Sequence, residues 1–366
     1  MTELKNVTVV LPSLDPDEKL GAVIDGLLEY GFSDIVLVND GSKEENLHYF
    51  TEAAQLPQVT LLHHPHNLGK GAALKTAFRY VLENRPESAG VITVDGDNQH
   101  HPEDTRNCTL HMLETGRLTL GVRDFSLPEV PARSRFGNRT TSLVFKIFVG
   151  LSIDDTQTGL RAIPRRDLEA LTEISGERFE YETNMLLAMK EQGIPFDQVK
   201  IRTVYIEENK SSHFRAIRDS WRIYKLILAH FFKYTASSLL SSVVDEGLFL
   251  LLTWALAKPL SGFALKAVPV VVARVVSSLL NFYMNHKLVF RSKVSHGTSL
   301  GRYFILAVGI AIGQMVLTYG ICTLFHIQEH QLAAQGIVYA VVMSLLFAVS
   351  FLAQQRWVFA EKKHGK

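Results

Sequence analysis

The sequence predicts an α/β domain with a mostly parallel sheet, followed by an all-α domain of four transmembrane helices. Three observations support this prediction. Short β-branched apolar runs alternate with helical patterns up to about residue 207, which is the rhythm of β-α-β units. Charged residues are dense up to about residue 225 and sparse beyond it. Four long apolar segments follow in that second part, and 366 residues are enough for two domains.

Whole-chain totals exclude several classes of protein. The 38 Lys and Arg residues balance 37 Asp and Glu residues, so no overall charge attracts nucleic acid. Two cysteines, Cys108 and Cys322, are too few for the disulfide framework of a small secreted protein. The first residues lack the basic leader of a signal peptide. We therefore expect the first half to stay in the cytosol, attached to a membrane by the second half.

The elements of the α/β domain follow from hydrophobic period and turn residues. Predicted strands cover residues 6–12, 34–40, 58–64 and 90–97, and predicted helices cover residues 17–31, 44–56 and 69–84. Sheets of this kind bind ligands at the carboxyl ends of their strands.

Polar residues follow these strand ends, at positions 12–15, 39–42 and 95–97. Residues two apart at a strand end share a face, so Asp95 and Asp97 can converge on a hard divalent cation. The Gly-rich turn at 67–71 opens a helix whose N-terminal amides and Lys70 could face a phosphate. Each stretch taken alone could equally be an ordinary capping or solvated turn.

In this order and spacing, the four stretches resemble glycosyltransferase family 2, which has the Rossmann-like, nucleotide-sugar-binding GT-A fold. The resemblance implies that Asp95, Asp97 and Gln99 hold Mg²⁺ or Mn²⁺ on the donor diphosphate, with Asp97 also catalytic. The donor contacts that it implies are Pro12, Leu14, Asp15, Asp40, Lys70, Asp95 and Ser212.

Two departures from the family pattern concern the nucleotide. Asp15-Pro16 stands where the family has Asn-Glu, and Asn39 stands where it has the first Asp. Both positions lie near the base and ribose pocket of the family. The identity of the nucleotide is therefore left undecided, with a UDP-sugar favoured.

Downstream segments specify the branch of the family. "LGVRDF", residues 132–150 and "DDTQTGLRAIPRR" resemble the polyprenol-phosphate glycosyltransferases, including the dolichol-phosphate-mannose synthases. By position, Arg123 and Arg135 match arginines that bind the acceptor phosphate, with Arg133 as a second choice. The planar guanidinium suits phosphate because it donates two parallel hydrogen bonds.

Two further parts of this domain are assigned by the resemblance. Asp155 matches the acidic residue of the Asp-x-x-Ser/Thr-Gly-Phe motif, with Leu160 in place of the aromatic residue. It would be catalytic by orienting the acceptor or stabilising the sugar, rather than by removing a proton. A loop at 209–214 falls where the family contacts the donor diphosphate, and its candidates are Lys210, Ser211, Ser212 and His213. The segment 143–151 could lie at the membrane interface or pack on the sheet.

The predicted division of the chain is a catalytic domain over residues 1–213, a juxtamembrane amphipathic helix over 214–234 and a membrane domain over 235–366. Its four spans cover about residues 235–257, 266–286, 303–325 and 332–352. Basic residues join spans two and three and end the chain: Arg291, Lys293, Arg302, Lys362, Lys363 and Lys366. Because basic loops face the cytoplasm, we expect both termini in the cytosol.

The membrane half contains an internal repeat. At an offset of 69 residues, positions 281–290 align with positions 350–359, and Asp245 aligns with Gln314. This predicts parallel repeats of two spans each. The half resembles the GtrA-like membrane family over about residues 230–360. Members of that family are proposed to aid the flipping or anchoring of lipid-linked sugars, and a passive anchor is an equal alternative.

Three ionisable residues interrupt the first two spans: Asp245, Glu246 and Arg274. With Lys233 as the cytosolic edge, Asp245 lies roughly 18 Å along its span. With Lys287 as the edge, Arg274 lies roughly 20 Å along the next. Charges at this depth are costly, so we expect Asp245 to pair with Arg274, leaving Glu246 on another face. A packing role alone, or a lipid-phosphate or transport role for Arg274, is the alternative.

Together these features predict a membrane-bound inverting glycosyltransferase of the cell membrane. It would transfer a hexose from a nucleotide sugar to polyprenyl phosphate, undecaprenyl phosphate in a bacterium, for cell-envelope glycans. The expected partners are donor, acceptor and bilayer, without nucleic acid and with a possible homo-oligomer.

Three other functions are alternatives to this reading of the sequence. The main alternative is a lipid-linked-sugar transporter with an accessory nucleotide-sugar-binding module. A processive synthase is disfavoured because Ala353 replaces the Gln of its Gln-x-x-Arg-Trp motif. A sugar-nucleotide pyrophosphorylase is disfavoured because residues 11–20 lack its early Gly-rich, basic loop.

Overall fold

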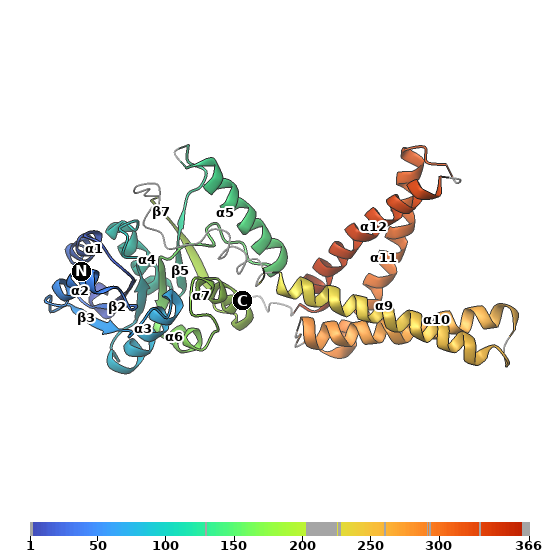
Figure 1. The fold of residues 1–366 in the computed structure, drawn as a ribbon, viewed down its shortest axis with the longest axis horizontal. Helices are drawn as coiled ribbons and strands as arrows, with labels where there is room; N and C mark the ends of the chain where they lie inside the picture. Colours follow the sequence, from blue (N-terminus) through green and yellow to red (C-terminus); the bar gives the residue numbers. More distant parts are fainter. Residues whose placement is uncertain are drawn as a thin grey trace. The chain divides into compact units, whose positions relative to one another are not determined.

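The computed structural model describes residues 3–128, 130–202, 225, 228–259, 261–290, 292, 294–328 and 331–360. It divides into two compact units, residues 1–226 and 227–366 (Figure 1). The loop at 209–214 with Ser212, most of the proposed juxtamembrane helix, and the basic residues Arg291, Lys293, Lys362, Lys363 and Lys366 lie outside the described residues.

The first unit alternates strands and helices. Its strands are β1 (Val7–Ser13), β2 (Ile35–Asn39), β3 (Val59–His63), β4 (Gly90–Thr93), β5 (Leu118–Arg123), β6 (Arg161–Pro164) and β7 (Phe196–Ile201). Its α-helices are α1 (Lys19–Glu29), α2 (Leu47–Ala53), α3 (Lys70–Asn84), α4 (Pro102–Thr115), α5 (Ala132–Val144), α6 (Arg165–Thr172) and α7 (Glu180–Gln192). Short turns of other helix types are η1 (Glu3–Asn6), η2 (Glu44–Asn46) and η3 (Phe145–Val149).

The seven strands form one sheet in the order β3-β2-β1-β4-β6-β5-β7. β6 runs antiparallel to β4 and β5, and the other neighbours are parallel. The prediction of a mostly parallel sheet is confirmed. The carboxyl ends of the parallel strands therefore meet at one edge, together with the beginning of β6. We call this the carboxyl edge of the sheet.

Helices cover both faces of the sheet, so its inner strands are buried on both sides, whereas the outer strands β3 and β7 are mostly half-buried. Alternate β1 residues such as Val9 and Leu11 join the core beneath α1, α2 and α4. In α1 the apolar residues recur with helical spacing and face this core: Leu20, Val23, Ile24 and Leu27. α3, α6 and α7 pack over the opposite face (Figure 1). This core holds the strand ends of the carboxyl edge in fixed positions.

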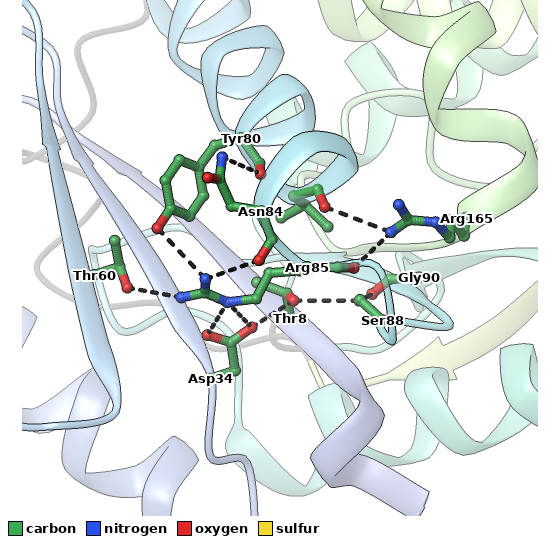
Figure 2. A network of polar contacts seen from close by, with 10 residues as sticks. Thr8, Asp34, Thr60, Tyr80, Asn84, Arg85, Ser88, Gly90 and Arg165 are labelled. Carbon is green, nitrogen blue, oxygen red and sulfur yellow. Dashed lines mark hydrogen bonds and ion pairs between the residues drawn. The ribbon is translucent and has the colours of Figure 1, made fainter.

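The opposite, amino edge of the sheet is closed by a polar network (Figure 2). Arg85, just beyond α3, donates its Nε to both carboxylate oxygens of Asp34, at 3.2 Å each. Its other nitrogens reach Thr60 at 3.0 Å and Tyr80 at 3.4 Å, and Thr8 donates to Asp34 at 2.6 Å. These groups satisfy one another and tie the beginnings of three strands to the end of α3.

The second unit contains α9 (Ala229–Leu256), α10 (Gly262–Met284), α11 (His296–Leu324) and α12 (Leu332–Ala353), with π-helical turns η5 (Asn285–Val289) and η6 (Gln354–Val358). In the described residues, four helical segments are long and apolar enough to cross a membrane: Phe231–Leu256, Phe263–Val289, His296–Leu324 and Leu332–Val358. The predicted number of four spans is confirmed. α9 packs along α10, and α11 packs along α12 (Figure 1).

Hydrogen bonds between the helices follow the internal repeat. η5 and η6 begin at Asn285 and Gln354, which are 69 positions apart, and Asn285 donates to the Gln354 amide oxygen at 3.0 Å. Two further hydrogen bonds are equivalent to each other under the same offset. Tyr234 donates to Ser350 at 3.1 Å, and Tyr303 donates to Asn281 at 3.0 Å. Each tyrosine on the first helix of one repeat thus binds the second helix of the other. Polar contacts of this kind hold helices together where hydrophobic packing gives little preference.

The structure brings together two of the three ionisable residues of the first two spans. Arg274 Nη2 lies 3.1 Å from Asp245 Oδ2. Ser277 donates to the other oxygen, Asp245 Oδ1, at 2.8 Å. The neighbouring Glu246 is exposed. Asp245 is thus shared between a cation and a hydroxyl from the same adjacent helix.

Breaking this pair is expected to destabilise the membrane unit. Asp245→Asn and Arg274→Gln should each lower the free energy of unfolding in detergent, because each leaves one partner without its counter-charge. The double variant should lose less than the sum, with a coupling of about 0.5–3 kcal/mol. The matched control is Gln314→Leu with Met343→Leu, the equivalent positions of the second repeat, which should not couple. Additive losses for Asp245 and Arg274 would contradict the pairing.

Candidate active site

Two acidic residues stand at the carboxyl edge, where β4 ends. β4 stops at Thr93, whose hydroxyl donates to the Gly159 carbonyl at 2.6 Å and so ties β4 to the loop before β6. Asp95 and Asp97 follow. The carboxylate of Asp95 lies against Gly159, where a Cβ would overlap Asp95 Oδ2. Glycine at this position therefore makes room for the acidic group, a role that the pattern "TQTGLR" did not reveal.

Lys70, the first residue of α3, is the cation of this site. Its ammonium lies 2.7 Å from Asp95 Oδ1 and 3.0 Å from Glu182 Oε1, and its side chain is largely buried. Glu182 comes from α7, far along the chain, and sequence reasoning did not select it. The expectation placed Lys70 near a phosphate, and here it joins two carboxylates.

The charges of the site shift the pKa values of its acids. Burial alone would raise the pKa of Asp95, but Lys70 outweighs it, with help from His100 and Arg123, and the pKa falls to about 2. Burial raises the pKa of Asp97, and the negative charge of Asp95 raises it further. The neighbouring positive groups thus stabilise the charge of Asp95 but do not prevent the raised pKa of Asp97, an arrangement that favours an additional cation.

Asp40 braces the Gly-rich turn. Its buried carboxylate accepts the backbone N–H groups of Leu68 and Gly69 at 3.0 and 2.8 Å, and the His64 ring lies 2.7 Å away. The Ala72 N–H donates to the carbonyl of Glu177, just before α7, at 2.9 Å. Protein acceptors therefore occupy these three N–H groups, and the expectation that N-terminal amides of this turn face a phosphate stays a prediction. His64 was not anticipated from the sequence.

Asp15 connects two strand ends. It has a positive φ of 47°, and its N–H donates to the Ser42 hydroxyl at 2.8 Å. Its Oδ1 accepts the Lys43 N–H at 2.8 Å. Pro12 is buried in β1 beside β2, and Leu14 is half-buried just beyond β1. These three predicted donor contacts therefore lie together at the carboxyl edge.

Arg123 and Asp155 form a second charged pair at the same edge. Arg123 ends β5, and its Nε and Nη2 donate to the two oxygens of Asp155 at 2.7 and 3.2 Å. The Asp155 side chain is completely buried, whereas that of Arg123 is 29% exposed. The exposed member of the pair is thus Arg123, and the buried carboxylate holds its guanidinium in place.

The other predicted arginines lie on α5. Arg135 donates through Nη2 to the carbonyls of Leu127 and Val130, at 2.9 and 3.3 Å. The backbone of Arg133 is part of the same helix, and its side chain lies outside the described atoms. Arg135 therefore supports the loop that follows β5 and Arg123.

Family models match both units of this chain. Residues 8–171 match the glycosyl transferase family 2 model, and residues 233–359 match the GtrA/DPMS transmembrane domain model. The chain contains a family 2 glycosyltransferase domain and a GtrA/DPMS transmembrane domain. The resemblance that the sequence motifs indicated is confirmed, and with it the GT-A class of the sheet domain.

Several curated relatives match the family 2 glycosyltransferase domain. An uncharacterised protein of Methanocaldococcus jannaschii is 28% identical over 62% of this chain and 93% of its own length. UDP-N-acetylglucosamine–dolichyl-phosphate N-acetylglucosaminyltransferase of Methanococcus voltae is 24% identical, over 56% and 87%. Undecaprenyl-phosphate mannosyltransferase of Micrococcus luteus is 26% identical, over 56% and 86%. The solved mannosyl-3-phosphoglycerate synthase of Rubrobacter xylanophilus is 16% identical, over 61% and 72%, with a TM-score of 0.49.

The acidic residues of this family 2 domain fit a hard divalent cation. Among the described residues, no group of three or more His, Cys, Asp or Glu side chains could hold a metal. Mg²⁺ sites, however, commonly use one or two carboxylates and complete the shell with substrate phosphates and water. Asp95 and Asp97 supply carboxylate oxygens, and Gln99, whose N–H donates to Asp97 Oδ1 at 3.1 Å, supplies an amide oxygen. This donor set fits Mg²⁺ or Mn²⁺.

Proposed function

We propose that this glycosyltransferase moves a hexose from a nucleotide sugar, with a UDP-sugar favoured, to a polyprenyl phosphate at the cytosolic membrane surface. The observation that carries the proposal is the presence of two charged clusters at one edge of the sheet. Lys70 with Asp95 provides the chemistry for a metal-bound donor diphosphate. Arg123, held by Asp155, provides a guanidinium for an acceptor phosphate, and its charge acts on Asp95.

The acceptor phosphate needs little help as a nucleophile. Its second pKa is near 6, so it is largely ionised at neutral pH and requires no strong general base. Asp155 is buried and bonded to Arg123, which suits a role in positioning rather than proton transfer. Arg123 would hold the phosphate oxygens for attack on the anomeric carbon from the face opposite the leaving diphosphate. That direction of attack inverts the anomeric configuration.

The donor side would be organised by the acidic residues and Lys70. Asp95, Asp97 and Gln99 would hold Mg²⁺ or Mn²⁺, which when bound neutralises charge on the departing nucleoside diphosphate. Lys70 stands beside Asp95 and would add a second positive charge to that side. Pro12, Leu14, Asp15 and Ser212 remain proposed donor contacts, and Asp40 supports the donor site through the Gly-rich turn.

The acceptor class is supported by the relatives and by the second unit. The relatives with named activities use dolichyl or undecaprenyl phosphate. Four helices that can cross a membrane bring the domain to the bilayer, where a polyprenyl lipid resides. We place the catalytic domain and both termini in the cytosol, because basic residues lie on that side of the spans.

The test is a transfer assay with the purified full chain. It should form a polyprenyl-phosphate sugar from undecaprenyl phosphate and one member of a panel of UDP- and GDP-sugars, in the presence of Mg²⁺ or Mn²⁺. NMR of the product should show an anomeric configuration opposite to that of the donor. Binding of nucleotide sugar without turnover across the panel would instead favour the transporter with an accessory binding module.

A further inference from the structure

We propose that Lys70 gates the metal site: its ammonium occupies Asp95 until a divalent cation replaces it, and Glu182 keeps it close for the diphosphate. This inference rests on the proposed function, because it concerns the same donor site. Lys70 Nζ lies 2.7 Å from Asp95 Oδ1 and 3.0 Å from Glu182 Oε1. Glu182 would be a positioning residue that acts through Lys70.

Lys70 and a divalent cation would compete for the Asp95 carboxylate. Asp95 is the proposed ligand nearest β4, and its carboxylate lies between Lys70 and Gly159. Without a side chain on Gly159, that carboxylate has room at this position but is already paired with an ammonium. A metal that takes Asp95 Oδ1 must therefore displace the ammonium, and this competition weakens metal binding before the donor arrives.

Glu182 gives the displaced ammonium a second partner. Its carboxylate side chain is 13% exposed and bonded to Lys70. It belongs to α7, a different element from the segment after β4 that carries Asp95. When the metal takes Asp95, Lys70 can keep its bond to Glu182 while its remaining donors turn to the diphosphate. An ammonium has three donors and turns easily, so a small rotation is sufficient. Lys70 would thus weaken the binding of metal alone and strengthen the binding of metal together with diphosphate.

A second lysine pair provides a matched control. Lys75 Nζ lies 2.9 Å from Glu177 Oε1, so it joins the same helix α3 to the chain just before α7. Its side chain is also largely buried, but it contacts Glu177 and the Tyr181 ring rather than Asp95. Loss of this pair should perturb the packing of α3 much as loss of Lys70 does, without changing the competition for Asp95.

The experiment measures Mn²⁺ binding to the full chain in detergent by electron paramagnetic resonance, without nucleotide. Lys70→Met should raise the affinity for Mn²⁺ about tenfold, because a charge-assisted hydrogen bond no longer competes for Asp95. Lys70→Gln is the second variant, in case the methionine variant does not fold. Glu182→Gln should lower the affinity severalfold, because Lys70 then binds Asp95 alone. In the Lys70→Met background, Glu182→Gln should add almost nothing.

Inorganic pyrophosphate, as a diphosphate without a base, tests the second half of the gate. At saturating Mn²⁺, Lys70→Met should bind pyrophosphate about tenfold more weakly, although it binds Mn²⁺ more tightly. Lys75→Met and Glu177→Gln should change neither affinity by more than about twofold. Opposite effects of one substitution on the two ligands are the signature that a purely structural role of Lys70 would not produce.

The outcomes separate this inference from the proposed function. Mn²⁺ binding that Asp97→Asn abolishes, but that Lys70→Met leaves unchanged or weakens, would overturn the gate and leave the metal site in place. An additive effect of Glu182→Gln in the Lys70→Met background would overturn the role of Glu182 and reduce it to long-range attraction. Absence of Asp97-dependent Mn²⁺ binding in the wild type would overturn the metal site itself, and the gate with it.

Discussion

Asp97→Ala is expected to abolish sugar transfer while the chain still folds and inserts into the membrane. Asp97 follows β4 at the carboxyl edge, and burial together with Asp95 raises its pKa, so it sits where an added cation is favoured. A metal ion contributes several kcal/mol of charge stabilisation in transfer reactions, which corresponds to a loss of about 10³-fold or more. The measurement is the rate of transfer at saturating Mn²⁺, with EDTA-treated wild type as a parallel.

The matched control is Asp34→Asn at the amino edge of the same sheet. Asp34 is also a partly buried acid, but it binds Arg85 and Thr8 in the network of Figure 2, away from the strand ends that carry Asp97. This change should lower the melting temperature and leave the transfer rate per folded molecule nearly unchanged. Undiminished turnover of Asp97→Ala, or of wild type in EDTA, would remove the metal from the mechanism.

Features that depend on local pattern could be predicted from the sequence. The strand leading to Asp95 is recognisable because β-branched residues end abruptly in acids, and the parallel pairing of β1, β2, β3 and β4 follows from the helices between them. Parallel strands place their ends together, so the convergence of Asp15, Asp40 and Asp95 at one edge needs no tertiary information. The pairing of Asp245 with Arg274 followed in the same way from their positions along two predicted spans.

Features that depend on distant contacts could not be predicted in this way. Glu182 reaches Lys70 only because α7 packs beside the beginning of α3, and no spacing in "RFEYETN" indicates this. Asp155 looked like a residue facing the acceptor, but its side chain is buried beneath Arg123. Burial of an acid depends on which neighbour covers it, here Arg123. The antiparallel pairing of β6 with β5 brings Asp155 to Arg123, and the alternating pattern of the sequence did not indicate that pairing.

Loss of either arginine, Arg123 or Arg135, is expected to weaken binding of the acceptor far more than binding of the donor. Arg123→Ala and Arg135→Ala should each raise the KM for polyprenyl phosphate more than tenfold, because a charge-assisted hydrogen bond contributes about 1.5–3 kcal/mol. Arg123→Lys should rescue only part of the loss, since an ammonium keeps the charge but not the planar fork. The KM for the nucleotide sugar should change little.

Asp155→Asn tests whether the buried carboxylate acts through Arg123. It removes the charge that holds Nε and Nη2, so the guanidinium is less well placed and the acceptor KM should rise. Because the effect passes through Arg123, Asp155→Asn should add little in an Arg123→Ala background. Asp124→Asn is the control, since it breaks the exposed pair with Lys200 immediately beside this site and should leave both KM values unchanged. Full additivity of the two changes would make Asp155 an independent contributor, and an unchanged acceptor KM in Arg123→Ala would move the phosphate site elsewhere.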